Sequence, residues 1–196
     1  MFMSNLKSLS LKSLTMGAGL ALIASPAAAQ VTPETAYVFN TFLFLVCGFL
    51  VMFMAAGFAM LESGMVRSKN VATICFKNIS LFSIAGLMYW LVGYNLMYGI
   101  EEGGYIGELF SVWSADDSAI AGETPNFEGG YSAGSDWFFQ MVFCATTASI
   151  VSGTIAERMK LWPFLIFTLF LTGFIYPIVG SWEWGTGFLD AMGFSD

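Results

Sequence analysis

The chain has 196 residues, of which 57% are hydrophobic and only 11% are charged, and its mean hydropathy is +0.71. Soluble domains carry about a quarter charged residues, so this composition excludes a soluble enzyme and a disordered chain. Seven Lys and Arg residues are too few for a nucleic-acid-binding protein. The absence of histidine excludes Ser-His-Asp and Cys-His catalysis and histidine metal sites, so we expect neither enzyme activity nor a cofactor.

The first 29 residues have the features of a secretory signal peptide. Lys7 and Lys12 form a basic region, residues 14–24 are apolar, and Ala27-Ala28-Ala29 supplies the small residues of a cleavage site. Eleven apolar residues are too few to cross about 30 Å of hydrocarbon at 1.5 Å per residue. We therefore predict a signal peptide over residues 1–29 and a mature N-terminus outside the cytoplasm.

Four long uncharged runs follow, and each is long enough to cross a membrane as a helix. Nothing in them alternates between apolar and polar residues as the strands of a transmembrane barrel do. Helices satisfy their own backbone hydrogen bonds in lipid, so these runs predict an all-α, multi-span transmembrane helical bundle. The expected spans are residues 35–65, 74–100, 137–157 and 161–182.

Charges between the spans predict the orientation of the bundle. Five basic residues follow the signal peptide: Arg67, Lys69, Lys77, Arg158 and Lys160. They lie in or beside the two short turns after the first and third spans, which should therefore be cytoplasmic. The connection over residues 101–136 holds eight acidic residues and no basic residue, and we expect it outside. The predicted location is the cell (inner) membrane, with a periplasmic or extracellular N-terminus.

Glu62 and Lys77 are ionisable residues near the inner ends of the first two spans. Such residues inside a membrane are candidates for a functional role. At 1.5 Å per residue, however, their depths differ little, and a lysine side chain can reach toward water. We therefore favour a structural Glu62–Lys77 ion pair at the inner rim over a proton relay.

Three local sequences carry a resemblance to a known family. Residues 57–70 read GFAMLESGMVRSKN, residues 140–160 read QMVFCATTASIVSGTIAERMK, and residues 182–189 read WEWGTGFL. Together, and in this order, they resemble the ammonium transporter (Amt/Mep/Rh) family. The resemblance extends from about residue 35 to residue 196, so residues 30–196 correspond to the N-terminal half of such a transporter.

The resemblance implies a fold of eleven transmembrane helices, two inverted repeats of five plus a last helix, assembled as a homotrimer. Such repeats enclose the substrate path in many transporters. Ammonium would be recruited by aromatic rings on the outer side, and ammonia would cross a hydrophobic pore in each protomer. The implied partners are ammonium or ammonia, the lipid bilayer and a cytosolic PII-type regulatory protein, with no nucleic acid.

Three residues match ligand-binding positions of the family. Phe143, three residues after Gln140, matches the phenylalanine that gates the pore. Trp184 matches the tryptophan that forms one wall of the outer ammonium site, and Asp196 matches the aspartate that supports that site from behind. A cation over an aromatic face gains roughly 0.5–2 kcal/mol, which allows capture and easy release.

Two other readings remain open at this stage. The same domain occurs as an ammonium sensor fused to a signalling domain, and the first half would look alike in both. A small membrane scaffold without substrate would leave the ordered motifs unexplained. Because the sequence ends at Asp196, before the expected pore histidines, we also expect that residues 1–196 alone do not conduct ammonium.

Overall fold

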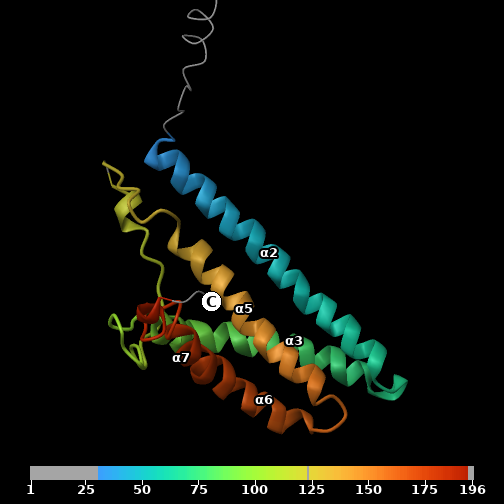
Figure 1. The fold of residues 1–196 in the computed structure, drawn as a ribbon. Helices are drawn as coiled ribbons and strands as arrows, with labels where there is room; N and C mark the ends of the chain where they lie inside the picture. Colours follow the sequence, from blue (N-terminus) through green and yellow to red (C-terminus); the bar gives the residue numbers. More distant parts are fainter. Residues whose placement is uncertain (1–30, 123, 194–196) are drawn as a thin grey trace, which may run out of the picture. The chain divides into compact units, whose positions relative to one another are not determined.

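The computed structural model describes residues 31–122 and 124–193, and these are entirely helices and connections, without a strand (Figure 1). The predicted signal peptide, residues 1–29, and Asp196 lie outside the described residues. The first long helix, α2 (Pro33–Met65), covers the expected span 35–65. It ends where Arg67 adopts an extended conformation with φ −63° and ψ 140°.

The second long helix is continuous from Val71 to Tyr98, but one turn of it is wider than an α-helix. It follows a short 3₁₀ turn, η1 (Ser68–Asn70), and consists of α3 (Val71–Met88), a π-helical turn, η2 (Tyr89–Gly93), and α4 (Tyr94–Tyr98). The helix begins three residues before the expected span over residues 74–100, and the limits of that span stay a prediction. A further 3₁₀ turn, η3 (Ser118–Ile120), lies in the long connection that follows.

The third and fourth long helices are α5 (Ala133–Thr154) and the continuous run α6 (Leu161–Phe170), η4 (Leu171–Ile175) and α7 (Tyr176–Ser181). Compared with the expected 137–157, α5 starts and ends earlier. In the turn that follows it, Glu157 adopts a left-handed φ of 62°. A last 3₁₀ turn, η5 (Asp190–Met192), closes the described chain.

The π turn η4 has an identifiable cause. Pro177 has no backbone N–H and cannot donate to the carbonyl four residues earlier, inside η4. The two π turns approach each other closely at Gly93, where a Cβ would lie 3.2 Å from the Thr172 carbonyl oxygen and 3.1 Å from Pro177. Glycine at this position therefore allows the second and fourth long helices to pack together.

The helices lie in a bundle in which α5 is the most enclosed (Figure 1). In Figure 1, α2 and α5 run side by side in the same direction, and α3 and α6–α7 return. Buried side chains of α3, α5 and α6 form the core, including Leu81, Ala145, Ala148 and Phe164. Small residues at such contacts let helix backbones approach closely.

Within residues 31–122 and 124–193, three helical segments are long and apolar enough to cross a membrane: Pro33–Met65, Ser68–Tyr98 and Leu161–Ser181. The chain is therefore a multi-span all-α bundle, as predicted. At about 33 Å, the 22 residues of α5 also suffice in length. Its composition is less apolar because it carries buried Gln, Ser and Thr residues that face other helices, so its crossing stays a prediction.

The bundle has two chemically different ends. We call the turns 66–70 and 155–160 together the basic end, because Arg67, Lys69, Arg158 and Lys160 lie there. The opposite end, formed by residues 99–122, 124–132 and 182–193, holds Glu101, Glu102, Glu108, Asp116 and Asp117, and we call it the acidic end (Figure 1). Both turns predicted to share one side of the membrane do lie at one end.

Candidate functional site

Two of the predicted ligand-binding residues meet where the middle of α5 approaches the turn after α7. Phe143 projects from α5 and Trp184 from the turn after α7, and their ring centroids lie 6.1 Å apart at an interplanar angle of 74°. Phe143 is half-buried, whereas Trp184 is 40% exposed. Two rings that are 41 positions apart in the sequence therefore lie within contact distance of each other. A second ring, Phe139, contacts Phe143 at 5.0 Å between centroids.

The turn that carries Trp184 is held by the segment after α4. The indole N–H of Trp182 donates to the carbonyl oxygen of Tyr105 at 2.9 Å, and the rings of Tyr105 and Phe188 stack at 4.7 Å. The N–H of Gly103 donates to the Thr186 carbonyl oxygen at 2.9 Å. Gly185 lies so close to the Met97 carbonyl oxygen that no Cβ fits. These contacts therefore hold the turn that carries Trp184 against the segment after α4.

A buried carboxylate lies two turns from Phe143 on the same helix. Asp136, in the first turn of α5, accepts a hydrogen bond from the hydroxyl of Tyr94 and another from the side chain of Gln140. The rings of Tyr94 and Tyr98 lie 5.0 Å apart beside it. Sequence reasoning counted Asp136 only as one of eight acidic residues of a loop. The spacing of Asp136, Gln140 and Phe143, on one face of a helix, could have indicated the cluster.

At the basic end, the predicted Glu62–Lys77 ion pair is present. The Nζ of Lys77 lies 3.1 Å from Oε2 of Glu62 and donates to the Ser152 carbonyl oxygen at 2.9 Å. The hydroxyl of Ser152 donates to the same Glu62 oxygen at 2.9 Å. The pair is more deeply enclosed than a rim position suggests, because Glu62 is 0% exposed. The Lys77 ammonium also lies 5.3 Å from the centre of the Phe164 ring.

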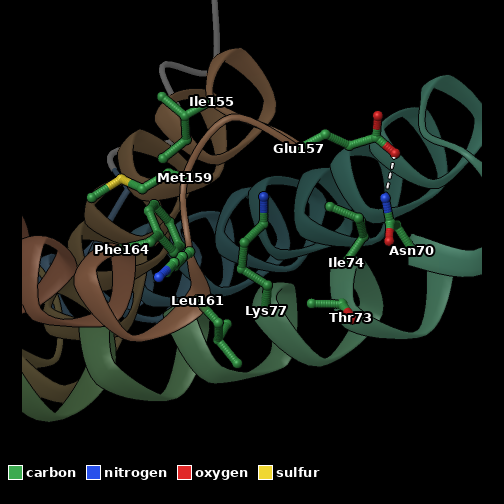
Figure 2. A pocket seen from close by; sticks show the side chains of 10 residues that line it. Asn70, Thr73, Ile74, Lys77, Ile155, Glu157, Met159, Leu161 and Phe164 are labelled. Carbon is green, nitrogen blue, oxygen red and sulfur yellow. Dashed lines mark hydrogen bonds between the residues drawn. The ribbon is translucent and has the colours of Figure 1, made fainter.

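A second contact joins the two turns of the basic end. Glu157 accepts a hydrogen bond from the side-chain amide of Asn70 (Figure 2). It also accepts hydrogen bonds from the backbone N–H and the Nε of Arg67. The hydrogen bond from Asn70, followed by those from Arg67, holds the pKa of Glu157 below its ordinary value. Two of the three motifs that carried the family resemblance, residues 57–70 and 140–160, therefore contact each other through Glu157.

Between these two contacts lies a cleft of about 320 Å³, into which Lys77 points from α3 (Figure 2). Asn70, Ile74, Ile155, Glu157 and Phe164 are among its lining residues. The Lys77 ammonium and the Glu157 carboxylate are already engaged, so the cleft presents no free charge of either residue. In residues 31–122 and 124–193, no group of three His, Cys, Asp or Glu side chains is placed to hold a metal ion.

Comparison with known proteins identifies the family of this chain. The model of the Ammonium Transporter Family matches residues 42–196. The chain belongs to this family. It is 45% identical over 154 residues to ammonium transporter Amt2 of Archaeoglobus fulgidus, covering 76% of this chain and 30% of that protein. It is 39% identical over 150 residues to ammonium transporter Amt1 of Haloferax mediterranei, and this match covers 76% of this chain and 27% of that protein.

A solved structure has the same fold. The protein named "Sensor Amt Protein" superposes with a TM-score of 0.70 at 34% identity, covering 83% of this chain and 40% of that one. The chain thus spans about a third of the length of the curated relatives that it matches. The chain belongs to this family, and its described part contains three helices long and apolar enough to span, so it is a multi-pass membrane protein.

Proposed function

We propose that the protein carrying this chain transports ammonium across a membrane. The observation that supports this most directly is the Phe143–Trp184 ring pair, which lies beside the acidic end of the bundle in a chain of the Ammonium Transporter Family. A cation at aromatic faces is attracted by roughly 0.5–2 kcal/mol, and more when it is desolvated. Capture of this strength permits release into a narrow apolar path, which conduction requires.

In this proposal the three predicted residues have separate roles. Trp184, with its 40% exposure, offers the first face to an ammonium ion from outside. Phe143, half-buried beneath it, controls passage between the rings and the apolar interior. Asp196 supports the site from behind; it lies outside the described residues, so this role rests on the family resemblance alone. No catalytic chemistry is required of these residues.

The orientation, location and partners belong to the same proposal. The acidic end faces the periplasm or the extracellular space and the basic end faces the cytoplasm, because basic turns are retained there. The membrane is the inner membrane, and the mature N-terminus is outside. A homotrimer and a cytosolic PII-type regulator complete the expected assembly, and the basic end is the surface available to a cytosolic partner.

The test uses uptake of radiolabelled methylammonium in a yeast strain lacking its own ammonium transporters. The chain is fused to the remaining spans of the Archaeoglobus fulgidus relative, and Trp184→Leu and Phe143→Leu are compared with Trp162→Leu. Trp162 is 73% exposed on α6, near the basic end, and serves as the matched control. We expect a raised KM for Trp184→Leu and no change for Trp162→Leu. Equal uptake by all three variants would overturn the proposal.

The sensor reading is the alternative, and the structural similarity to the protein named "Sensor Amt Protein" favours keeping it. A sensor must bind ammonium but needs no net flux. Saturable ammonium binding by the fusion protein, without growth on limiting ammonium at any expression level, would favour the sensor. Growth that depends on Trp184 would favour the transporter.

A further inference from the structure

Asp136 is a buried carboxylate without a basic partner in the described part of the chain. Its exposed fraction is 7%, although it lies at the start of α5, next to the acidic end. The two ion pairs among the described residues join Arg67 to Glu157 and Lys77 to Glu62, and both belong to the opposite half of the bundle. Buried charges are normally paired, so the charge of Asp136 calls for a cation that comes from elsewhere.

The groups around Asp136 are suited to a cation. Tyr94 donates its hydroxyl proton to Oδ2 of Asp136. Gln140, one helical turn further along α5, is 6% exposed and hydrogen-bonds to Asp136 through its side chain. Its Oε1 atom is buried and has no hydrogen-bond partner among the described residues. A carboxylate and an unpaired amide oxygen, neighbours at i and i+4 on one helix face, are two acceptors that an anion could not use.

Aromatic side chains also lie close to Asp136. The hydroxyls of Tyr98 and Tyr131 are close enough to interact electrostatically with Asp136. The ring of Tyr94 lies 5.7 Å from that of Trp113, at 64°, and 5.0 Å from that of Tyr98. Aromatic faces attract weakly hydrated monovalent cations. Divalent cations instead require several carboxylates and carbonyl oxygens, and a single carboxylate does not supply them.

We propose that Asp136 and the side-chain oxygen of Gln140 hold a monovalent cation among these tyrosines. The site precedes the Phe143–Trp184 pair by seven residues of α5, which is about 10 Å along the helix. It would therefore concentrate cations just outside the ring pair. The carboxylate, the amide oxygen and the rings select a cation by its charge and size. Only the identification of this cation as ammonium rests on the proposed transport function.

The test measures binding of radiolabelled methylammonium to the chain in lipid nanodiscs by scintillation proximity. All proteins carry Trp184→Leu, which removes binding at the ring pair. Asp136→Asn removes the charge, Gln140→Leu removes the second acceptor, and Glu128→Gln is the control because it removes an exposed carboxylate of the acidic end. We expect saturable binding that Asp136→Asn weakens roughly tenfold or more, and Gln140→Leu less, since contacts to charged groups are the stronger ones.

Three outcomes would overturn the proposal. The first is no saturable binding in the Trp184→Leu background, which leaves the transport proposal intact because the ring pair is absent from every protein tested. The second is an equal effect of Asp136→Asn and Glu128→Gln. The third is an infrared band of a protonated carboxylic acid that disappears in Asp136→Asn, because a neutral Asp136 needs no cation. If Asp136→Asn fails to fold, the proposal is still tested by the loss of binding in Gln140→Leu and by the infrared band of a protonated carboxylic acid in the parent protein.

Discussion

Breaking the buried Glu62–Lys77 pair should destabilise the chain strongly. In Lys77→Met, the Glu62 carboxylate stays fully buried, and its remaining donor among the described residues is the Ser152 hydroxyl. Oε1 of Glu62 already has no partner among those residues, and the Ser152 carbonyl oxygen would lose the Lys77 donor as well. Removing one partner of a buried ion pair costs about 3–5 kcal/mol, so we expect a loss of this size in the free energy of unfolding.

The measurement is reversible unfolding in mixed micelles on titration with SDS, followed by circular dichroism. Lys69→Met is the matched control, because Lys69 is exposed in the adjacent turn and surface charges contribute less than about 1 kcal/mol. The double variant Glu62→Gln, Lys77→Met removes both charges and should be less destabilised than either single variant. Equal stability of Lys77→Met and Lys69→Met would refute the reasoning, since it would mean that the pair is not enclosed as the structure has it.

Three more predictions concern the turns at the two ends. Gly185→Ala should displace the turn that carries Trp184, since a Cβ would collide with the Met97 carbonyl oxygen. Methylammonium uptake by the yeast fusion should therefore fall as it does in Trp184→Leu. Gly122→Ala is the control and should not change uptake, because a Cβ at Gly122 has open space around it. The lowered pKa of Glu157 means that its contribution to stability is complete above the ordinary value of 4.5 and is lost as the pH falls through the lowered value. SDS unfolding over a pH series should therefore show that the parent chain loses stability at acid pH and that Glu157→Gln does not show this loss. Parallel pH profiles of stability for the two proteins would contradict the prediction. In intact cells, with the three native cysteines replaced, Ser118→Cys should react with an impermeant thiol reagent and Ser68→Cys should not; the reverse result would invert the orientation.

The sequence by itself determined the helices and much of the ring site. Long uncharged runs without strand-like alternation predict helices in lipid, because helices satisfy their own backbone hydrogen bonds there. The observed helices begin and end within four residues of the expected limits. The helix ends differ from the expected limits where the local backbone conformation departs from a helix. After α5, for example, Glu157 has a left-handed backbone that a continuing helix would not allow. The Glu62–Lys77 pair followed from depth alone, because helix rise places both residues at one level.

The tertiary structure decided which distant groups share a buried site. Ser152 joins the Glu62–Lys77 pair across 90 positions from Glu62, and Glu157 reaches Arg67 across the same separation. Asp136 reads in the sequence as the last acid of a hydrophilic connection, yet the fold buries it beside Tyr94, 42 positions away. Periodicity describes one helix at a time, whereas these contacts depend on how helices pack and rotate against each other. The charge of a buried residue therefore acquires its partners, or lacks them, only when the bundle is assembled.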